Sequence, residues 1–501
     1  MKTKPSSRPR TRPFPFASTA NRLPVAAGLA LLSVTPLQAD TQYWNKTTPN
    51  LTWANSSNAN WAATEDGTSY ATWTSGNDAE IVTPDAQITL GGSAPLNVGN
   101  LTIRNGAFFT GTTGYSTTVN ISGTGGRGDF TLQDIDGGGA KARIAFATTT
   151  AGDGYNGTIT VNSFTDTYSG LVLGGNTKPA SPPSTLGGTG VNTHVILNGG
   201  KIMLEAGLVG TAATLGSLSG SGVIALTNVY SSTGGTRTLR IDQTADTAFS
   251  GAVGATTITQ SNNILALVKA GEGRLAITNT EASGSGYAGD TTVEGGKLYL
   301  AGTFGSTSSG GTNVNQGNFI VKATATLGLS GTFNTGGAKT VTIENGGTLD
   351  LSNGSTTIDG IGTTTSKGLV FSGNATLIAS VGADGSTLTL ADATMTGSAE
   401  GGDGSIRIKL ANANAQVGET CDLIHFGGTT PGIAITAFVL AQESIDAGWA
   451  GTLAYGGDGN TLQFTISALP AAIPEPATTA ALIAALAAVA TILLRRRHIY
   501  N

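Results

Sequence analysis

The chain has few of the residues on which metal sites and disulfide-stabilised domains depend. It contains one cysteine, Cys421, and three histidines, His194, His425 and His498, among 501 residues. A single cysteine cannot form an intrachain disulfide, so the fold must be held by packing and hydrogen bonds, with Cys421 as a small buried hydrophobe. Histidines this scattered, without cysteine or glutamate at ligand spacing, do not make a zinc site. We expect no catalytic centre, no metal site and no cofactor.

Charge is also scarce. Charged residues make up 11% of the chain, against roughly 25% in an ordinary soluble domain. Nine of the 26 basic residues lie in the two terminal segments, which leaves 17 basic and 30 acidic residues in the body between them. Such a body offers no basic surface to nucleic acid, so we expect no nucleic-acid partner.

What is abundant favours β structure with frequent turns. The chain has 74 glycines and is rich in Thr, Ser, Asn and Ala, with Val, Ile and Leu distributed throughout. Thr, Val and Ile suit strands, whereas Gly and Asn suit the turns between them. Hydrophobic residues still reach 39%, which is too many for a disordered chain.

The N-terminus has the parts of a secretory signal. A basic stretch precedes the apolar run 25–34, which is too short to span a bilayer, and Leu37-Gln38-Ala39 follows it. This order predicts that residues 1–39 are a signal peptide, cleaved between Ala39 and Asp40 after passage through the export translocon. No adjacent arginine pair occurs there, which favours the general export route.

The C-terminus carries a second predicted address. A short motif precedes the apolar run 480–494: Pro474, Glu475 and Pro476. A basic cluster ends the run: Arg495, Arg496 and Arg497. Counted from Ala477, a helix of this run would be about 27 Å long, marginally enough to cross the hydrocarbon core. The arginines would then stay on the cytoplasmic side.

The tail, residues 471–501, closely resembles the PEP-CTERM sorting signal, in which Pro-Glu-Pro, an apolar helix and a basic cluster follow one another. The resemblance implies a Gram-negative host and an exosortase-like membrane enzyme as partner. That enzyme would process the tail during its transient insertion in the inner membrane, and the protein would reach the cell surface or the extracellular matrix. A plain tail anchor, or a short alanine-rich helix packed on the body, is the alternative.

The body repeats a short phrase. Gly-Gly pairs follow Asn or Glu at 199–200, 295–296 and 346–347, with a weaker copy at 105–106. From Gly200 to Gly296 is 96 residues and from Gly296 to Gly347 is 51, near four and two steps of about 25, a length typical of solenoid repeats. Glycine lets the chain turn a sharp corner at each copy.

The residues after each corner alternate. Leu298 and Leu300 are expected to point to one side of a strand, and Lys297 and Tyr299 to the other. A single rung cannot bury such an apolar stripe, but stacked rungs can. We therefore predict an all-β fold, a parallel β-helix or solenoid with terminal caps. Several globular β-sandwiches are the alternative, although the one linker-like segment, 178–183, is better explained as a loop projecting from a rung.

Segment 267–298 resembles the autotransporter-associated β-strand repeat. That repeat begins Lys-x-Gly-x-Gly-x-Leu, continues aromatic-x-Gly-x-Thr and ends Gly-x-Leu; the matching parts here are 269–275, 287–291 and 296–298. The resemblance implies a right-handed parallel β-helix. An autotransporter ends in a membrane barrel, whereas this chain ends in the Pro-Glu-Pro tail, so export is not expected to be self-driven.

Both ends of the body differ from its middle. Four of the five tryptophans lie close together near the start: Trp44, Trp53, Trp61 and Trp73. They predict an aromatic N-terminal cap, with a patch that stacks on sugar rings as the alternative. Near the other end, strands at 453–455 and 461–464 flank the glycine-rich segment 456–460, which predicts a hairpin.

The enzymatic alternative is a polysaccharide hydrolase or lyase. Such chemistry needs paired carboxylates, or acids with a basic partner. The candidates are Asp134 and Asp136 with Lys141 and Arg143, although the glycines at 137–139 favour a solvated turn. Calcium could be considered at 401–404 or 456–460, but neither segment has the tandem spacing of calcium-binding solenoids.

We therefore expect five parts: a signal peptide (1–39), a Trp-rich cap (40–98), solenoid repeats (99–414), a C-terminal β cap (415–470) and the sorting tail (471–501). The expected function is structural or adhesive, at the cell surface or in the matrix, with an exopolysaccharide as a candidate partner. A glycan-binding module and the polysaccharide enzyme remain the alternatives.

Overall fold

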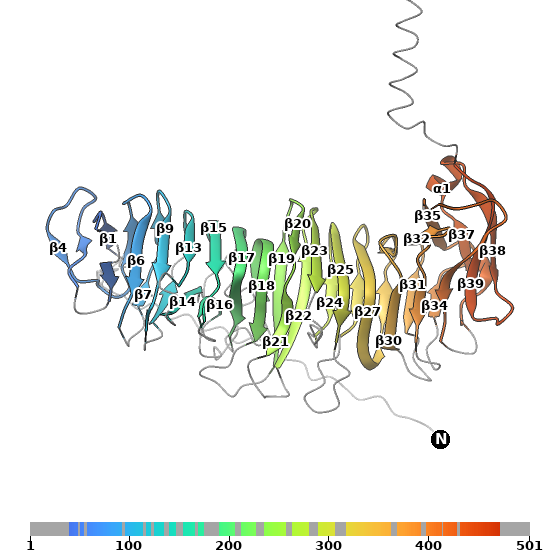
Figure 1. The fold of residues 1–501 in the computed structure, drawn as a ribbon, viewed down its shortest axis with the longest axis horizontal. Helices are drawn as coiled ribbons and strands as arrows, with labels where there is room; N and C mark the ends of the chain where they lie inside the picture. Colours follow the sequence, from blue (N-terminus) through green and yellow to red (C-terminus); the bar gives the residue numbers. More distant parts are fainter. Residues whose placement is uncertain are drawn as a thin grey trace, which may run out of the picture. The chain divides into compact units, whose positions relative to one another are not determined.

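Short strands that pair in parallel dominate the computed structural model (Figure 1). The structure describes residues 40–48, 51–54, 58–92, 96–113, 117–121, 125–134, 140–146, 154–165, 169–174, 190–205, 212–226, 235–256, 263–279, 289–305, 317–361, 368–391, 397–412, 414–427 and 431–470. All of them belong to one compact unit, Ala39–Asn501; the other unit, Met1–Gln38, lies outside the described residues.

The pairings sort the strands into three faces, and each turn of the chain, or rung, visits them in the order 1, 2, 3. Face 1 contains the strands β1 (Thr41–Trp44), β5 (Asp78–Ile81), β8 (Leu101–Ile103), β12 (Gly125–Arg127), β19 (Gly235–Asp242), β22 (Asn263–Ala270), β24 (Thr291–Val293), β26 (Phe319–Val321), β28 (Val341–Ile343), β31 (Leu369–Ser372) and β34 (Gly397–Glu400).

Face 2 contains β2 (Leu51–Trp53), β6 (Ala86–Leu90), β9 (Ala107–Thr110), β13 (Phe130–Leu132), β20 (Thr247–Phe249), β23 (Arg274–Asn279), β29 (Thr348–Asp350), β32 (Ala375–Val381), β35 (Ile406–Asn412) and β37 (Phe438–Leu440). Face 3 contains β7 (Leu96–Val98), β11 (Thr117–Ile121), β14 (Ala140–Phe146), β16 (Gly170–Leu173), β21 (Ala252–Thr256), β30 (Thr356–Ile361), β33 (Leu388–Leu390) and β36 (Thr420–His425).

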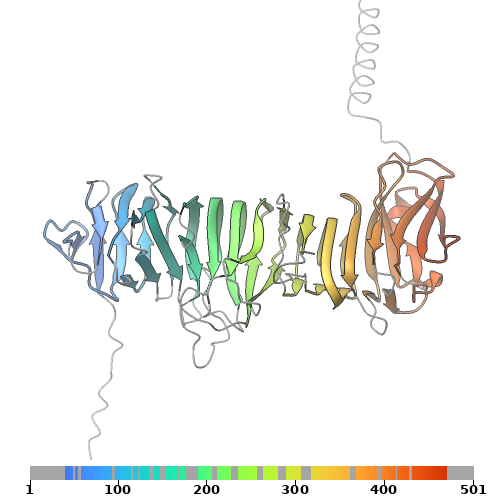
Figure 2. The ribbon, with the colours of Figure 1, turned by 60° about the horizontal axis from the view of Figure 1, so that its bottom comes forward.

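Longer strands bend from one face to the next: β15 (Gly154–Asn162), β17 (Gly190–Leu204), β18 (Ala212–Leu226), β25 (Lys297–Phe304) and β27 (Thr326–Lys339). A two-residue strand, β10 (Thr112–Thr113), pairs antiparallel with β14. Figure 2 shows the succession of strands from a second direction.

Alternate residues of each strand point into the stack and form continuous apolar ladders. One ladder on face 2 runs through five successive strands, with every member 0% exposed: Leu275, Leu298, Leu327, Leu349 and Leu377. Ile277 pairs with Leu300, 23 residues on, and Leu300 with Leu329, 29 residues on. Each rung therefore buries the stripe that its neighbour presents, as the alternation of Leu298 and Leu300 predicted.

A residue with positive φ recurs at the corner between faces 1 and 2. The members have φ between 49° and 109°: Asp85, Gly106, Gly128, Gly271, Gly296, Thr324, Gly346, Asn374 and Gly404. Three of these positions belong to the phrase found in the sequence, at 105–106, 295–296 and 346–347. The remaining copy, 199–200, lies between faces 2 and 3 within β17, so the phrase encodes a corner without specifying which one.

Antiparallel segments close both described ends. At the first, β3 (Trp61–Ala62) pairs antiparallel with β1 and with β4 (Tyr70–Ala71). At the last, β39 (Thr461–Ala468) pairs antiparallel with β36 and with β38 (Ala450–Tyr455), which is the expected hairpin. The short helices η2 (Ile435–Ala437) and α1 (Gln442–Asp446) also lie there.

The prediction of an all-β solenoid is confirmed at this level, because one long, mainly parallel sheet runs through the described residues instead of separate β-sandwiches. No helix in this described part of the chain is long and apolar enough to cross a membrane. The signal peptide (1–39) and the apolar helix predicted after Ala477 lie outside it.

Candidate functional site

The predicted address residues lie almost entirely outside the described residues. This applies to Ala39, to the Pro-Glu-Pro motif at 474–476 and to the arginines at 495–497. Asp40, on the far side of the predicted cleavage point, is the first described residue and is exposed. The cleavage and sorting hypotheses therefore stay predictions.

The four N-terminal tryptophans pack against one another. Each is at most 3% exposed: Trp44, Trp53, Trp61 and Trp73. The ring centroids of Trp61 lie 4.7 Å from those of Trp53 and Trp73. Rings buried in this way offer no free face to a sugar, and the packing is that of an aromatic cap. Glycan binding by these rings would require the cap to open.

The candidate catalytic residues are only partly within the described chain. Asp136 lies outside it. The carboxylate oxygens of Asp134 are shielded from solvent and have no hydrogen-bond partner among the described residues. Lys141 is half-buried in β14. Arg143, also in β14, forms an ion pair with Glu205 (Nη2 to Oε1, 2.5 Å), and both side chains are 1% exposed. Arg143 is thus engaged in a buried ion pair rather than directed to solvent.

The two described histidines bond neighbouring hydroxyls. His194 is exposed, and its Nδ1 lies 2.8 Å from Ser217 Oγ on the next rung. His425 Nδ1 lies 3.0 Å from Thr461 Oγ1. Cys421 is buried and its Sγ accepts a hydrogen bond from the Gly382 amide at 3.3 Å. Burial raises the pKa of the Cys421 thiol above its ordinary value, so the thiolate needed for reactivity is disfavoured. His498 lies outside the described residues.

Neither calcium candidate has the form of a cation site. Segment 401–404 is a turn between β34 and β35. In segment 456–460 the carboxylate of Asp458 accepts hydrogen bonds from the Asn460 amide (2.9 Å) and the Thr461 hydroxyl (2.8 Å), which close the turn. Among the described residues, no group of three or more His, Cys, Asp or Glu side chains could hold a metal ion.

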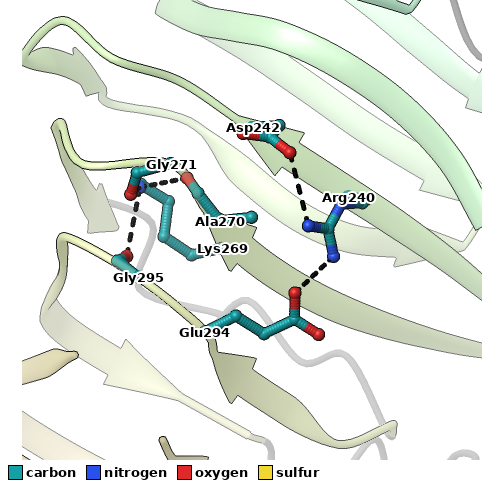
Figure 3. A network of polar contacts seen from close by, with 7 residues as sticks. All are labelled: Arg240, Asp242, Lys269, Ala270, Gly271, Glu294 and Gly295. Atoms are coloured by element: carbon teal, nitrogen blue, oxygen red, sulfur yellow. Dashed lines mark hydrogen bonds and ion pairs between the residues drawn. The ribbon is translucent and has the colours of Figure 1, made fainter. Parts of the chain in front are cut away.

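Several charged side chains stabilise the corners of the solenoid. The sequence patterns did not single them out. Lys269 points inward from β22, in line with Leu265 and Leu267, and its side chain is 0% exposed. Figure 3 shows its ammonium at the corner, where it donates to the carbonyls of Ala270, Gly271 and Gly295. Burial lowers the pKa of Lys269 from 10.5 to about 8, against the opposing effect of nearby carboxylates.

Lys269 is the first residue of the Lys-x-Gly-x-Gly-x-Leu phrase. Its inward direction follows from the strand period: residues 265, 267 and 269 share a face. That signal was present in the sequence, but lysine is seldom fully buried without partners. Here three carbonyls from two successive rungs supply them.

Arg240 forms ion pairs on the outer surface of face 1. Its guanidinium lies between Asp242 (3.3 Å) and Glu294 (2.5 Å), as Figure 3 shows. Arg240 is in β19 and Glu294 follows β24, two rungs further along face 1. Burial would lower the pKa of Arg240, but the hydrogen bonds and charge of Glu294 outweigh it and raise the pKa.

A second ion pair also spans two rungs. Lys297 in β25 reaches Asp350 in β29 across β27. Gly328 of β27 lies between them and has no side chain in the path; a Cβ there would lie 3.3 Å from Lys297 Cε. Burial would raise the pKa of Asp350, but hydrogen bonds from Lys297 and Ser352 outweigh it and lower the pKa.

Arg237 braces a corner between faces 3 and 1. It points inward from β19, is 0% exposed, and donates to the carbonyl of Leu204 at 3.2 Å. Burial lowers the pKa of Arg237, while the charge of Glu205 opposes this effect. Together these contacts place the charged groups named above between rungs, which they hold in place.

Comparisons with known proteins add no assignment. The scan against protein-family models matched no family, and the search of curated proteins found no match. Inferences about function therefore depend on the residues and geometry of this chain.

Proposed function

We propose that this protein is an exported, non-catalytic structural or adhesin-like component of a Gram-negative cell surface or extracellular matrix. The observation that carries the proposal is the use of charged side chains as braces between rungs, in a body whose chemistry-bearing residues are few. Lys269 bonds the next rung, Arg240 and Lys297 each form an ion pair with a residue two rungs further along, and Arg143 is held in a buried ion pair. A stack reinforced in this way suits a durable scaffold.

The predicted addresses supply the cellular part of the proposal. The N-terminal segment has the order of a secretory signal, and the C-terminal tail resembles the PEP-CTERM signal. In this proposal the export translocon and an exosortase-like enzyme handle the chain in turn, with transient insertion of the tail in the inner membrane. Right-handed winding, implied by the repeat resemblance, also agrees with the usual hand of parallel β connections.

The sorting step can be tested by replacing Pro474 and Glu475 with alanine. The proposal expects this variant to remain uncut in the inner membrane, whereas the unchanged protein reaches the exterior with a new C-terminus. Mass analysis of the mature termini after cell fractionation measures both. Replacing Thr478 and Thr479 with alanine, just beyond the motif, is the matched control and should leave sorting intact. Normal release of the Pro474/Glu475 variant would refute exosortase-type handling.

A further inference from the structure

The strand β38 pairs on one side only. It forms a ladder with β39, and it is the longest of the described strands that has a single partner strand. The strands β33, β36, β39 and β38 follow one another in pairing, so the free side of β38 faces away from the stack at its C-terminal end (Figure 1). Four of the six residues of β38 are exposed.

The hydrogen bonds of β39 show which backbone groups of β38 face outward. Residues on antiparallel strands alternate between pairs that exchange hydrogen bonds and pairs that do not. Ile466 of β39 donates to Glu419 O (2.9 Å), on the side away from β38. Its counterpart in β38, Gly451, is therefore turned away from β39, and by the same alternation so are Leu453 and Tyr455. The N–H and C=O groups of these three residues form an open edge.

The open edge lacks the features that usually prevent strands from pairing. Soluble proteins guard such edges with lysine, with proline, with a bulge or by keeping the strand very short. The segment 447–457 contains neither a charged residue nor a proline. The one shift of register in the ladder lies between Ala450 and Gly451, before the open edge begins. The strand itself therefore does not oppose the addition of another strand.

The apolar layer of the cap stops abruptly at β38. Leu453 and Tyr455 are half-buried, whereas the residues directly opposite them on β39, Phe464 and Leu462, are 0% exposed. Residues directly opposite each other share one face of a sheet. A further strand beside β38 would extend this apolar layer and cover Leu453 more fully.

We propose that β38 pairs antiparallel with β38 of a second copy of this chain, about a two-fold axis at Leu453. In this register Leu453 lies opposite its counterpart and Gly451 opposite Tyr455, so every outward N–H and C=O group of the open edge has a partner. A two-fold contact uses one self-complementary patch on both molecules, and the open groups are spaced symmetrically about Leu453. The contact joins two solenoids end to end through their C-terminal caps.

Charge permits this contact between two copies. Like charges directly opposite each other destabilise a strand pair, and the uncharged segment 447–457 places none at the contact. Thr452 and Ala454, which are exposed on the outer side of β38, would lie opposite each other across the two-fold axis. The inference goes beyond the proposed surface role and does not depend on export or sorting.

The test measures the mass of purified full-length protein by sedimentation equilibrium as its concentration rises, in a mild detergent that keeps the apolar run 480–494 dispersed. The key variant, Thr452→Lys with Ala454→Lys, places lysines of the two copies opposite each other. The matched control, Thr420→Lys with Ala391→Lys, makes the same changes at exposed positions on β36 and just after β33. Circular dichroism checks that each variant is folded.

The unchanged protein and the control should associate to twice the mass of one chain. The key variant should need at least about tenfold higher concentration, which corresponds to about 1.4 kcal/mol. Hydrogen exchange at single residues gives a second readout. The Leu453 amide should become protected as the dimer forms, whereas the Ala454 amide, which faces β39, should be protected at every concentration.

Three results would overturn the inference. The unchanged protein could remain monomeric, which would leave the edge to some other strand. The key variant could associate as strongly as the control, or the Leu453 amide could stay unprotected in the dimer, and either result would place the contact elsewhere in the chain. None of these measurements involves export, so the proposed function would stand or fall separately.

Discussion

Thr324 adopts a backbone conformation that its side chain disfavours. Its φ is 64°, in the left-handed region that β-branched residues rarely enter. The turn between β26 and β27 requires this conformation, because the equivalent corner in other rungs has glycine, asparagine or aspartate with positive φ. The stack imposes the corner geometry on whatever residue occurs there.

Replacing Thr324 with asparagine should therefore stabilise the protein. Left-handed φ costs most L residues about 1–2 kcal/mol, and asparagine tolerates it better, so we expect a gain of about 1 kcal/mol. Urea unfolding followed by circular dichroism measures it. The reverse change, Asn374→Thr at φ 58°, should lose at least as much, because it also removes the hydrogen bonds of the Asn374 side chain with Asn345 and Arg407. A loss of stability in the Thr324→Asn protein would contradict this account.

The buried Lys269 should make the folding stability of the protein depend on pH. Burial holds its pKa near 8 in the folded protein, whereas an unfolded lysine titrates near 10.4. Between these values the unfolded chain binds more protons, so folding stability rises with pH. A neutral amine still donates to the corner carbonyls without the cost of burying charge.

We expect this contribution to reach at most about 3 kcal/mol between pH 8 and 10.5. It is measured as the difference in unfolding free energy between the unchanged protein and Lys269→Met across that range. The control, Lys322→Met, removes a lysine whose side chain is 44% exposed. A difference that stays flat, or that falls with rising pH, would show that the three carbonyls fully compensate the buried charge.

Individual strands show what the sequence could predict. Alternation placed Leu298 and Leu300 inside correctly, because a period of two is a property of the strand itself. It did not foresee that Asp350, on the outer side of β29, would be 4% exposed. That burial depends on Lys297, two rungs away, and on Gly328 between them, a relation set by register rather than by local sequence. The repeated phrase likewise indicated corners but could not assign 199–200 to a different one.

Glycines at close backbone contacts set how near two rungs can lie. At Gly331, with φ 113°, an added Cβ would lie 2.1 Å from the carbonyl oxygen of Gly302 on the preceding rung. Gly346, with φ 80°, has nothing within 4 Å of such a Cβ. At both positions a side chain would strain the backbone, because φ is positive, but only at Gly331 would it also collide with a neighbouring rung.

This difference predicts unequal effects of alanine. Gly346→Ala should cost about 1–2 kcal/mol, from backbone strain alone. Gly331→Ala should cost about 2 kcal/mol more, because β25 and β27 must move apart. Thermal unfolding of both variants measures the contrast, and equal losses would mean that the rungs separate without penalty.

The whole described body is built from contacts between successive rungs. Most pairings join strands of adjacent rungs, so stability is expected to add up along the stack rather than to act through one central core. The caps matter in this arrangement because an open parallel edge can pair with another chain. At the first end Asn60 Nδ2 donates to Thr52 O of β2 (2.8 Å) beside the tryptophan cluster. At the last, Phe426 and Ile433 approach Gly397 of β34.

The sequence showed that the ends differ from the middle, but not how the stack is closed. Tryptophans crowded near Trp53 are compatible with an exposed binding patch or a buried cap, since composition does not reveal which face of a ring is covered. Only the packing distances distinguish the two arrangements. The predicted sorting role of residues 471–501 would depend on recognition by another protein, so it cannot follow from the physics of this fold.

Replacing Trp53 with alanine tests how much the N-terminal cap contributes to stability. It also tests whether stability adds up rung by rung along the stack. The side chain is 0% exposed and packs on Trp61 and Trp73, so its loss should cost about 3–5 kcal/mol. In a stack of nearest-neighbour contacts this loss stays local. Hydrogen exchange should therefore accelerate in β1–β9 while β25–β35 keep their protection. Trp449→Ala, at the other cap and 4% exposed before the change, should give the reverse pattern. Uniform loss of protection from either variant would mean that the body unfolds as one cooperative unit.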